Sequence, residues 1–105
     1  MKSITDKLVV NSIFRPEGEM TIYTVLEHKA CLIEMLASQQ NLQIDLSAVS
    51  EMDSAGLQLL FLAKLESDRR NFAIEFVDMS PAVMEVVKLC HVEHFEINNS
   101  MGRNH

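Results

Sequence analysis

The sequence predicts a single α/β domain in which a mixed sheet of four or five strands packs against helices, in the order ββαβαβα. The length of 105 residues suits one domain with one core, and 48% of the residues are hydrophobic while 23% are charged. Segments rich in β-branched residues alternate with segments of helical periodicity. Helices between strands require crossover connections, so we expect at least part of the sheet to be parallel.

The first strands are expected to form a β-hairpin. Short β-rich stretches occupy residues 8–10 and 13–14, and the Arg-Pro-Glu-Gly sequence at 15–18 has the composition of a turn. Polar and apolar residues alternate over 19–23, which predicts a second strand. An antiparallel hairpin is the natural way to join these two strands.

The first helix is expected to begin at Thr24 and to end near Ser38. Thr24 and Glu27 have the spacing of a capping box, in which the hydroxyl accepts a hydrogen bond from a backbone N–H and the carboxylate reaches back. Four apolar residues then recur at helical spacing: Leu26, Ala30, Ile33 and Ala37.

The central part of the chain predicts a strand at 42–46, a polar loop at 47–52 and a long helix over 56–70. Asp53 and Ser54 supply the signal for the start of this helix, because short polar side chains satisfy its first N–H groups. In open α/β sheets, functional residues usually lie where strands end and helices begin. We therefore expect Asp53 and Ser54 to lie in an exposed functional segment.

The last third predicts a strand at 72–77 that ends at Asp78, and then a third helix. Ser80 is an N-cap signal, and Pro81 suits the first helical position, where a backbone N–H is not needed. A short strand or turn is expected at 95–97.

One domain is expected over residues 1–97, followed by a flexible polar tail at 98–105. The longest apolar run in the middle of the chain, residues 59–63, is far shorter than the roughly 20 residues of a transmembrane helix. The first residues do not resemble a secretory signal, so we expect a cytoplasmic protein without direct membrane insertion. Cys31 and Cys90 are then expected to be reduced, half-buried thiols.

The composition argues against nucleic acids and nucleotides as ligands. The formal net charge is −6, whereas nucleic-acid backbones are bound mainly by clustered lysine and arginine. Base stacking has little support from one tyrosine and no tryptophan. The three glycines are too scattered to form either common glycine-rich phosphate loop.

No enzyme active site, metal site or cofactor is predicted. Asp45, Asp53 and Asp78 lie near strand ends, as in a phosphoaspartate receiver, but the acidic pair after the first strand and the lysine after the last are missing. Asp45 and Asp78 are better explained by local hydrogen bonds that cap loops and helices. His91 and His94 lack a further ligand at fixed spacing, so they are interpreted as surface residues.

Apolar residues are dense in the second predicted helix. Six of the seven residues from 57 to 63 are apolar, and they point all the way round the helix. Two interpretations stay open: the helix is central and packed on both flanks, or part of its surface is offered to a partner.

Several segments resemble the STAS domain family, the fold of bacterial anti-sigma factor antagonists. Residues 44–49 (Ile-Asp-Leu-Ser-Ala-Val) and 52–57 (Met-Asp-Ser-Ala-Gly-Leu) are similar to the family signature. Residues 18–22 match its second-strand entry, and segments between 77 and 95 are similar to its last helix and tail. The resemblance covers about residues 8–97.

The resemblance implies a serine or threonine, in a D-[ST]-[ST]-G motif, that a partner kinase phosphorylates. By position this residue is Ser54, and Ala55 replaces the second hydroxyl residue. Partner-binding residues are expected around it: Asp53, Ser54, Ala55, Gly56, Gln58, Ser47 and Ser50. Supporting roles are expected for Asp45, Asp78 and Ser80.

The physical chemistry of Ser54 fits such a switch. The N-terminus of a helix tolerates a phosphate, which would add about −1.5 to −2 charges beside Asp53. A partner that accepts the free hydroxyl would then be repelled. The alternative is that Ser54 is only an N-cap.

Two functions follow from the resemblance. The first is a partner-switching regulator that binds a serine/threonine kinase or anti-sigma factor when unphosphorylated, with a phosphatase as a further partner. The second is a non-switching adapter, for example a subunit of a bacterial lipid-transport ABC complex or of a chemotaxis-type assembly. The oligomeric state stays open.

Overall fold

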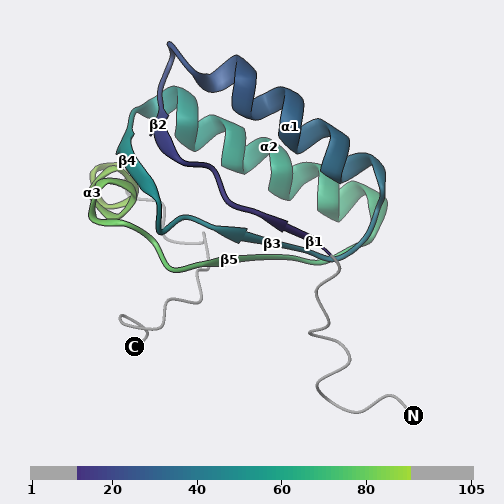
Figure 1. The fold of residues 1–105 in the computed structure, drawn as a ribbon. Coiled ribbons are helices and arrows are strands. Elements are labelled where there is room, and N and C mark those ends of the chain that lie inside the picture. Colours follow the sequence, from purple (N-terminus) through teal and green to yellow (C-terminus); the bar gives the residue numbers. More distant parts are fainter. Residues whose placement is uncertain (1–11, 91–105) are drawn as a thin grey trace.

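Five strands and three helices lie within residues 12–90, the part of the chain that the computed structural model describes (Figure 1). In chain order they are β1 (Ser12–Phe14), β2 (Gly18–Met20), α1 (Val25–Ala37), β3 (Leu42–Asp45), β4 (Val49–Met52), α2 (Ser54–Arg70), β5 (Ile74–Val77) and α3 (Pro81–Leu89). The expected α/β architecture is confirmed. One strand is added to the expected order, because β4 lies where a polar loop was expected at 47–52.

The strands pair in parallel in two small sheets, β1–β3–β5 and β2–β4. In the first sheet Phe14 lies opposite Ile44, and Ile44 lies opposite Phe76. In the second sheet Met20 lies opposite Met52. Because the chain runs from β1 into β2 and from β3 into β4, the second sheet prolongs the first (Figure 1).

The expected N-terminal hairpin is wrong. Within residues 12–90, β1 and β2 do not pair with each other, and all strand pairs are parallel. Gly18 has a left-handed backbone with φ of 78°, and its N–H donates to the Ala48 carbonyl at 3.0 Å. Residues 15–17 therefore offset the strand instead of reversing it, so that Phe14 and Met20 are both buried in the core.

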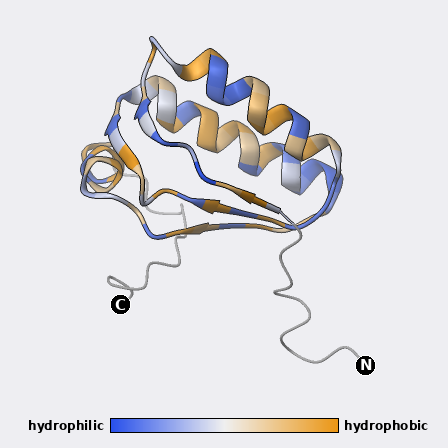
Figure 2. Cartoon of the chain, viewed as in Figure 1, coloured by the Kyte–Doolittle hydropathy of each residue, from blue (hydrophilic) through white to orange (hydrophobic). Residues whose placement is uncertain are grey.

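The helices cover the strands from two directions. α1 and α2 lie side by side over the strands, while α3 packs against β4 (Figure 1). Hydrophobic residues occur along the strands of the first sheet and along α1 and α2, interspersed with hydrophilic ones (Figure 2). The buried core consists of Phe14, Met20, Leu32, Leu36, Leu42, Ile44, Leu46, Val49, Leu59, Leu60, Ala63, Phe76 and Val83.

The dense apolar run of α2 is covered by other elements. Of the residues from 57 to 63, Gln58 alone is exposed. The interpretation of a central helix packed on both flanks is therefore confirmed. Its buried or partly buried apolar residues are Leu57, Leu59, Leu60, Phe61, Leu62 and Ala63.

Helix α1 begins after Thr24, as expected, but the capping box does not form. The Thr24 hydroxyl donates to the Glu19 carbonyl at 2.8 Å and accepts from the Thr21 N–H at 3.0 Å, so it holds the β2–α1 loop. The helix buries Leu32 and Leu36. The apolar set that predicted the helix is exposed instead: Leu26, Ala30, Ile33 and Ala37.

The β5–α3 connection agrees with its sequence signals. Asp78 adopts a left-handed backbone with φ of 53° directly after β5. Ser80 is the N-cap of α3: its hydroxyl accepts from the Val83 N–H at 3.3 Å, and its own N–H donates to the Leu46 carbonyl at 3.2 Å. Pro81 is the first helical residue, as expected.

The remaining expectations concern the two cysteines, membrane-spanning helices and the ends of the chain. Both cysteines are free, but they are exposed and not half-buried. No helix among the described residues is long and apolar enough to cross a membrane. Some expectations lie outside the described residues: the strands at 8–10 and 95–97, the tail at 98–105, and the surface histidines His91 and His94.

The central position of α2 predicts how two of its leucines differ in their contribution to stability. Leu60 is fully buried, whereas Leu65 is 65% exposed on the same helix. Leu60→Ala is expected to lower the free energy of unfolding by about 2–5 kcal/mol, because it leaves a cavity in the core. Leu65→Ala is the matched control, with an expected change within about 0.5 kcal/mol in urea unfolding. Equal losses would contradict the packing described here.

Candidate functional site

The start of α2 is organised by the carboxylate of Asp53. Asp53 is the N-cap residue, and its Oδ1 accepts from the N–H groups of Ala55 at 2.9 Å and Gly56 at 3.3 Å. Its Oδ2 accepts from the Ile22 N–H at 3.0 Å. One side chain thus joins the helix to the β2–α1 loop, and we call these three hydrogen bonds the Asp53 bridge.

The β2–α1 loop is held in place by its own threonines. The Thr21 hydroxyl accepts from the Tyr23 N–H at 3.3 Å. The Thr24 hydroxyl, at the end of the loop, is bonded to the backbone of Glu19 and Thr21 at its start. His28 adds a contact of 2.7 Å between its Nε2 and the Glu19 carbonyl oxygen. These contacts position the Ile22 N–H that the Asp53 bridge uses.

The bridge also stabilises the charged form of Asp53. The Ile22 N–H, followed by the N–H groups of Gly56 and Ala55, lowers the pKa of Asp53 below its ordinary value, against a smaller opposing effect of burial. The carboxylate is therefore ionised at neutral pH. It supplies a fixed negative charge at the N-terminus of α2, where the helix dipole favours one.

Ser54 is the first residue of α2 and is exposed. No residue between 12 and 90 hydrogen-bonds its side chain. Asp53 is the cap, so the alternative that Ser54 is only an N-cap is wrong. The Ser54 hydroxyl is thus available at the surface, next to a charged side chain.

Gly56 lets α2 approach β2 closely. It is buried, and a Cβ atom at this position would collide with the backbone carbonyl oxygen of Met20 and contact the Met20 side chain. The Asp53 N–H donates to that same carbonyl at 3.3 Å. A glycine is needed here for space, since Gly56 has an ordinary helical backbone.

The other expected partner-binding residues are distributed along β4 and α2. Gln58 and Ser50 are exposed, while Ala55 is half-buried. Ser47 is exposed at the turn between β3 and β4, so it lies at the opposite end of β4 from Ser54. Buried Gly56 can support a contact surface but offers no side chain to it.

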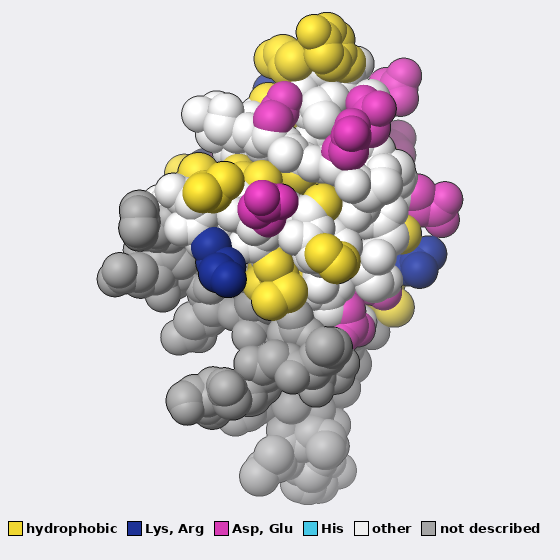
Figure 3. All heavy atoms as spheres, turned by 90° about the vertical axis from the view of Figure 1, so that its left-hand side faces the viewer, with side chains coloured by type: hydrophobic (Ala, Val, Ile, Leu, Met, Phe, Trp, Pro, Cys, Tyr) yellow, Lys and Arg dark blue, Asp and Glu magenta, His cyan; other side chains and the backbone are white. Residues whose placement is uncertain are grey.

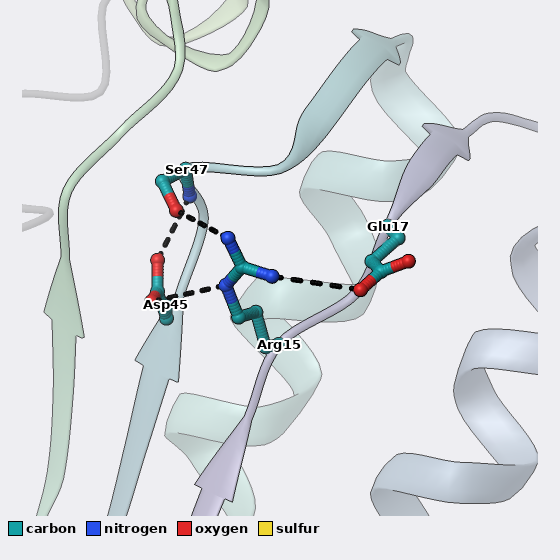
Figure 4. A network of polar contacts seen from close by, with 4 residues as sticks. All are labelled: Arg15, Glu17, Asp45 and Ser47. Atoms are coloured by element: carbon teal, nitrogen blue, oxygen red, sulfur yellow. Dashed lines mark hydrogen bonds and ion pairs between the residues drawn. The ribbon is translucent and has the colours of Figure 1, made fainter.

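Ser47 belongs to a separate polar network around Arg15 (Figure 4). The Arg15 guanidinium lies 3.4 Å from Asp45 Oδ2, 3.5 Å from Glu17 Oε2 and 3.4 Å from the Ser47 hydroxyl. Asp45 Oδ1 accepts from the Ser47 N–H at 2.9 Å. This network ties the end of β3 to the segment between β1 and β2. The supporting role expected for Asp45 stays a prediction.

The Arg15 network also acts on the pKa of Asp45. Partial burial raises this pKa, but the hydrogen bonds from Ser47 and the nearby Arg15 charge outweigh it, and the pKa lies below its ordinary value. The charged groups of this network pair with one another, and they connect the segments that join the two sheets.

Two residues of these networks were missed by the sequence analysis. Ile22 contributes only its backbone N–H to the Asp53 bridge, and every non-proline residue carries that group. Arg15 lies in the segment that the sequence predicts as a turn, and its ion pairs with Glu17 and with Asp45 at the end of β3 have no signal in the sequence. Within residues 12–90, no group of three histidine, cysteine or carboxylate side chains is placed to hold a metal ion.

The close contact at Gly56 predicts a large effect of a small substitution. Gly56→Ala would normally favour a helix, by up to about 1 kcal/mol. Here we expect a loss of about 1–3 kcal/mol in the free energy of unfolding, because the new methyl group pushes α2 away from β2. Urea unfolding checks this, and a stabilised Gly56→Ala variant would contradict the described approach of helix and strand.

The Asp53 bridge predicts a pH-dependent contribution to stability. Asp53→Ala is expected to cost about 0.5–2 kcal/mol at neutral pH, because a helix cap is lost. The folded-state pKa is lowered, so this contribution is present above the unfolded-state pKa of about 4 and is lost as the pH falls through the folded-state pKa. The difference in the free energy of unfolding between wild type and variant should therefore shrink as the pH falls through that folded-state pKa. A difference that is undiminished in acid would exclude the charged bridge.

Two solved structures share this fold at low sequence identity. TM1081 from Thermotoga maritima, assigned as an anti-sigma factor antagonist, has a TM-score of 0.72 and 17% identity, over 87% of this chain and 80% of that one. The anti-sigma factor antagonist SpoIIAA in its unphosphorylated form has a TM-score of 0.67 and 19% identity, over 88% and 82%. A search of curated proteins found no significant match.

The family comparison agrees with the architecture. The STAS domain matches residues 3–103, a range that contains both sheets, all three described helices and the Asp53 bridge. The chain belongs to the STAS domain family.

Proposed function

We propose that this STAS domain is a partner-switching regulator of the anti-sigma factor antagonist type. In its unphosphorylated form it binds a serine/threonine kinase or anti-sigma factor through the start of α2. Phosphorylation of Ser54 ends that binding, and a phosphatase restores it. The observation that carries this proposal is the exposed Ser54 hydroxyl, which no described residue engages, at the first position of a helix capped by its neighbour.

The Asp53 bridge separates modification from folding. Asp53 already occupies the N–H groups of Ala55 and Gly56, which a phosphate would otherwise use. A phosphate on Ser54 therefore has few internal partners and extends toward solvent. The fold is expected to persist while the surface changes from a neutral hydroxyl to a dianion.

The charge around Ser54 makes this change effective. Asp53 is adjacent and ionised, and Glu51 is exposed on the preceding strand. A phosphate adds about −1.5 to −2 charges to this already acidic region. A partner surface that accepts the hydroxyl is then repelled, or is left with a desolvated and unpaired contact.

Substitutions at Ser54 test the proposal directly. Ser54→Ala is expected to change the free energy of unfolding by less than about 0.5 kcal/mol, because Ser54 is not the cap. It should retain the kinase permanently in pull-downs from the source cytoplasm, quantified by mass spectrometry. Ser54→Asp should recover less kinase, though more than the phosphoprotein, because a carboxylate carries less charge.

Ser38→Asp is the matched control for added charge. Ser38 is an exposed serine at the far end of α1, and this variant should bind as wild type does. If both Ser54 variants also bind as wild type does, and no phosphate is found on Ser54 in cells, switching is excluded. The protein would then be a non-switching adapter.

A further inference from the structure

The outer face of α1 and the loop before it form an exposed apolar surface. We define this α1 surface as Ile22, Tyr23, Leu26, Ala30 and Ile33. Tyr23 is 89% exposed and Leu26 is 75% exposed. The N–H groups of Thr24 and Val25 already donate to the Thr21 carbonyl, so the loop winds into the helix and places Ile22 one turn before Leu26.

Helix α1 therefore has two apolar faces. One face contacts the core through Leu32 and Leu36. A helix that packs on one side needs a single apolar stripe. The second stripe adds nothing to the described core, and a contiguous exposed apolar patch is typical of an interaction site.

Two acidic side chains lie on the β2–β4 pair, which leads directly into the loop at the start of this surface. Glu19 and Glu51 lie directly opposite each other in the β2–β4 pair, and both are exposed. Like charges in that position destabilise a sheet. Within residues 12–90, no lysine or arginine forms an ion pair with either glutamate. In Figure 3, hydrophobic side chains at the top of the molecule lie directly above acidic ones.

Acidic side chains also outnumber basic ones along the edges of the α1 surface. Glu27 and Glu34 border one long edge of the α1 surface and Lys29 borders the other. A second copy of the chain would bring the same glutamates and the same net charge of −6 to the contact. An anionic membrane surface would be repelled for the same reason.

We propose that the α1 surface binds an amphipathic helix of a protein partner whose apolar face is flanked by lysine or arginine. Its apolar residues cover Tyr23, Leu26 and Ile33, and its cations pair with Glu19 and Glu51. This contact goes beyond the function proposed for Ser54, because it needs no modification. It adjoins the Asp53 bridge, since the Ile22 N–H donates to Asp53.

A designed peptide of known structure tests this inference. The probe is a fluorescent helix of about 14 residues with leucine on one face and lysine elsewhere, and the control peptide carries glutamate in place of lysine. The full chain is expected to bind the lysine peptide and not the glutamate peptide. Leu26→Glu should weaken binding of the lysine peptide at least about tenfold, and Glu51→Gln should weaken it and reduce its salt dependence.

Leu65→Glu is the matched control, because Leu65 is also a largely exposed leucine, on α2 and outside the α1 surface. It should change peptide affinity less than about twofold, and circular dichroism should show both leucine variants folded. Equal effects of Leu26→Glu and Leu65→Glu, or equal binding of the two peptides, would overturn the inference. A dimer in sedimentation that Leu26→Glu dissociates would assign the α1 surface to a second copy instead.

The same titration separates this inference from the proposed switch. Ser54→Asp adds negative charge, so it should not weaken binding of the lysine peptide, whereas it should weaken kinase binding. If Ser54→Asp leaves kinase binding unchanged while the lysine peptide still binds, the switch is excluded and the α1 surface is not. If the lysine peptide does not bind while Ser54→Asp still weakens kinase binding, the binding role of the α1 surface is excluded and the switch is not.

Discussion

The hydrogen bonds of the Asp53 carboxylate are the interactions on which the candidate functional segment, the start of α2, depends. It accepts from two N–H groups of α2 and from the Ile22 N–H of the β2–α1 loop, so three segments meet at one side chain. Ser54 owes its exposed position to this arrangement, because Asp53 serves as the cap and leaves the serine at the first helical position. The start of the α1 surface is held by the same carboxylate through Ile22.

Close packing of backbone against backbone makes that geometry possible. Gly56 allows α2 to approach the Met20 carbonyl, and the Asp53 N–H donates to the same oxygen. Met20 is fully buried, so the strand end cannot move away without opening the core. The candidate segment at the start of α2 therefore lies on a closely packed part of the domain. The proposed switch would accordingly act through surface charge and not through a rearrangement of the helix.

The sequence predicted the starts of the helices well, although the capping box at Thr24 does not form, and it predicted strand pairing poorly. The starts of α2 and α3 followed from Asp53 and Ser80, because capping depends on neighbours in the chain. The hairpin failed because strand pairing is decided by which partners bury Phe14 and Met20, and composition does not show that. In α1, periodicity identified an apolar face but not which of two faces the core would cover. The candidate site was located by a cap signal and a family resemblance, whereas the Ile22 N–H has no side-chain signature.

Two adjacent residues at the start of α2 have different roles: Asp53 caps the helix, and Ser54 exposes its hydroxyl. If the serine itself were the cap, a phosphate on it would interact with the first N–H groups of the helix, so modification and helix capping would be coupled. Here Asp53 accepts from the N–H groups of Ala55 and Gly56, so the Ser54 side chain is not needed to cap the helix. The fixed negative charge of Asp53 also means that an added anion raises the local negative charge, and the Arg15 cation is paired at the other end of β4. For the proposed switch, this separation means that the surface charge at Ser54 can change without removing the cap of α2.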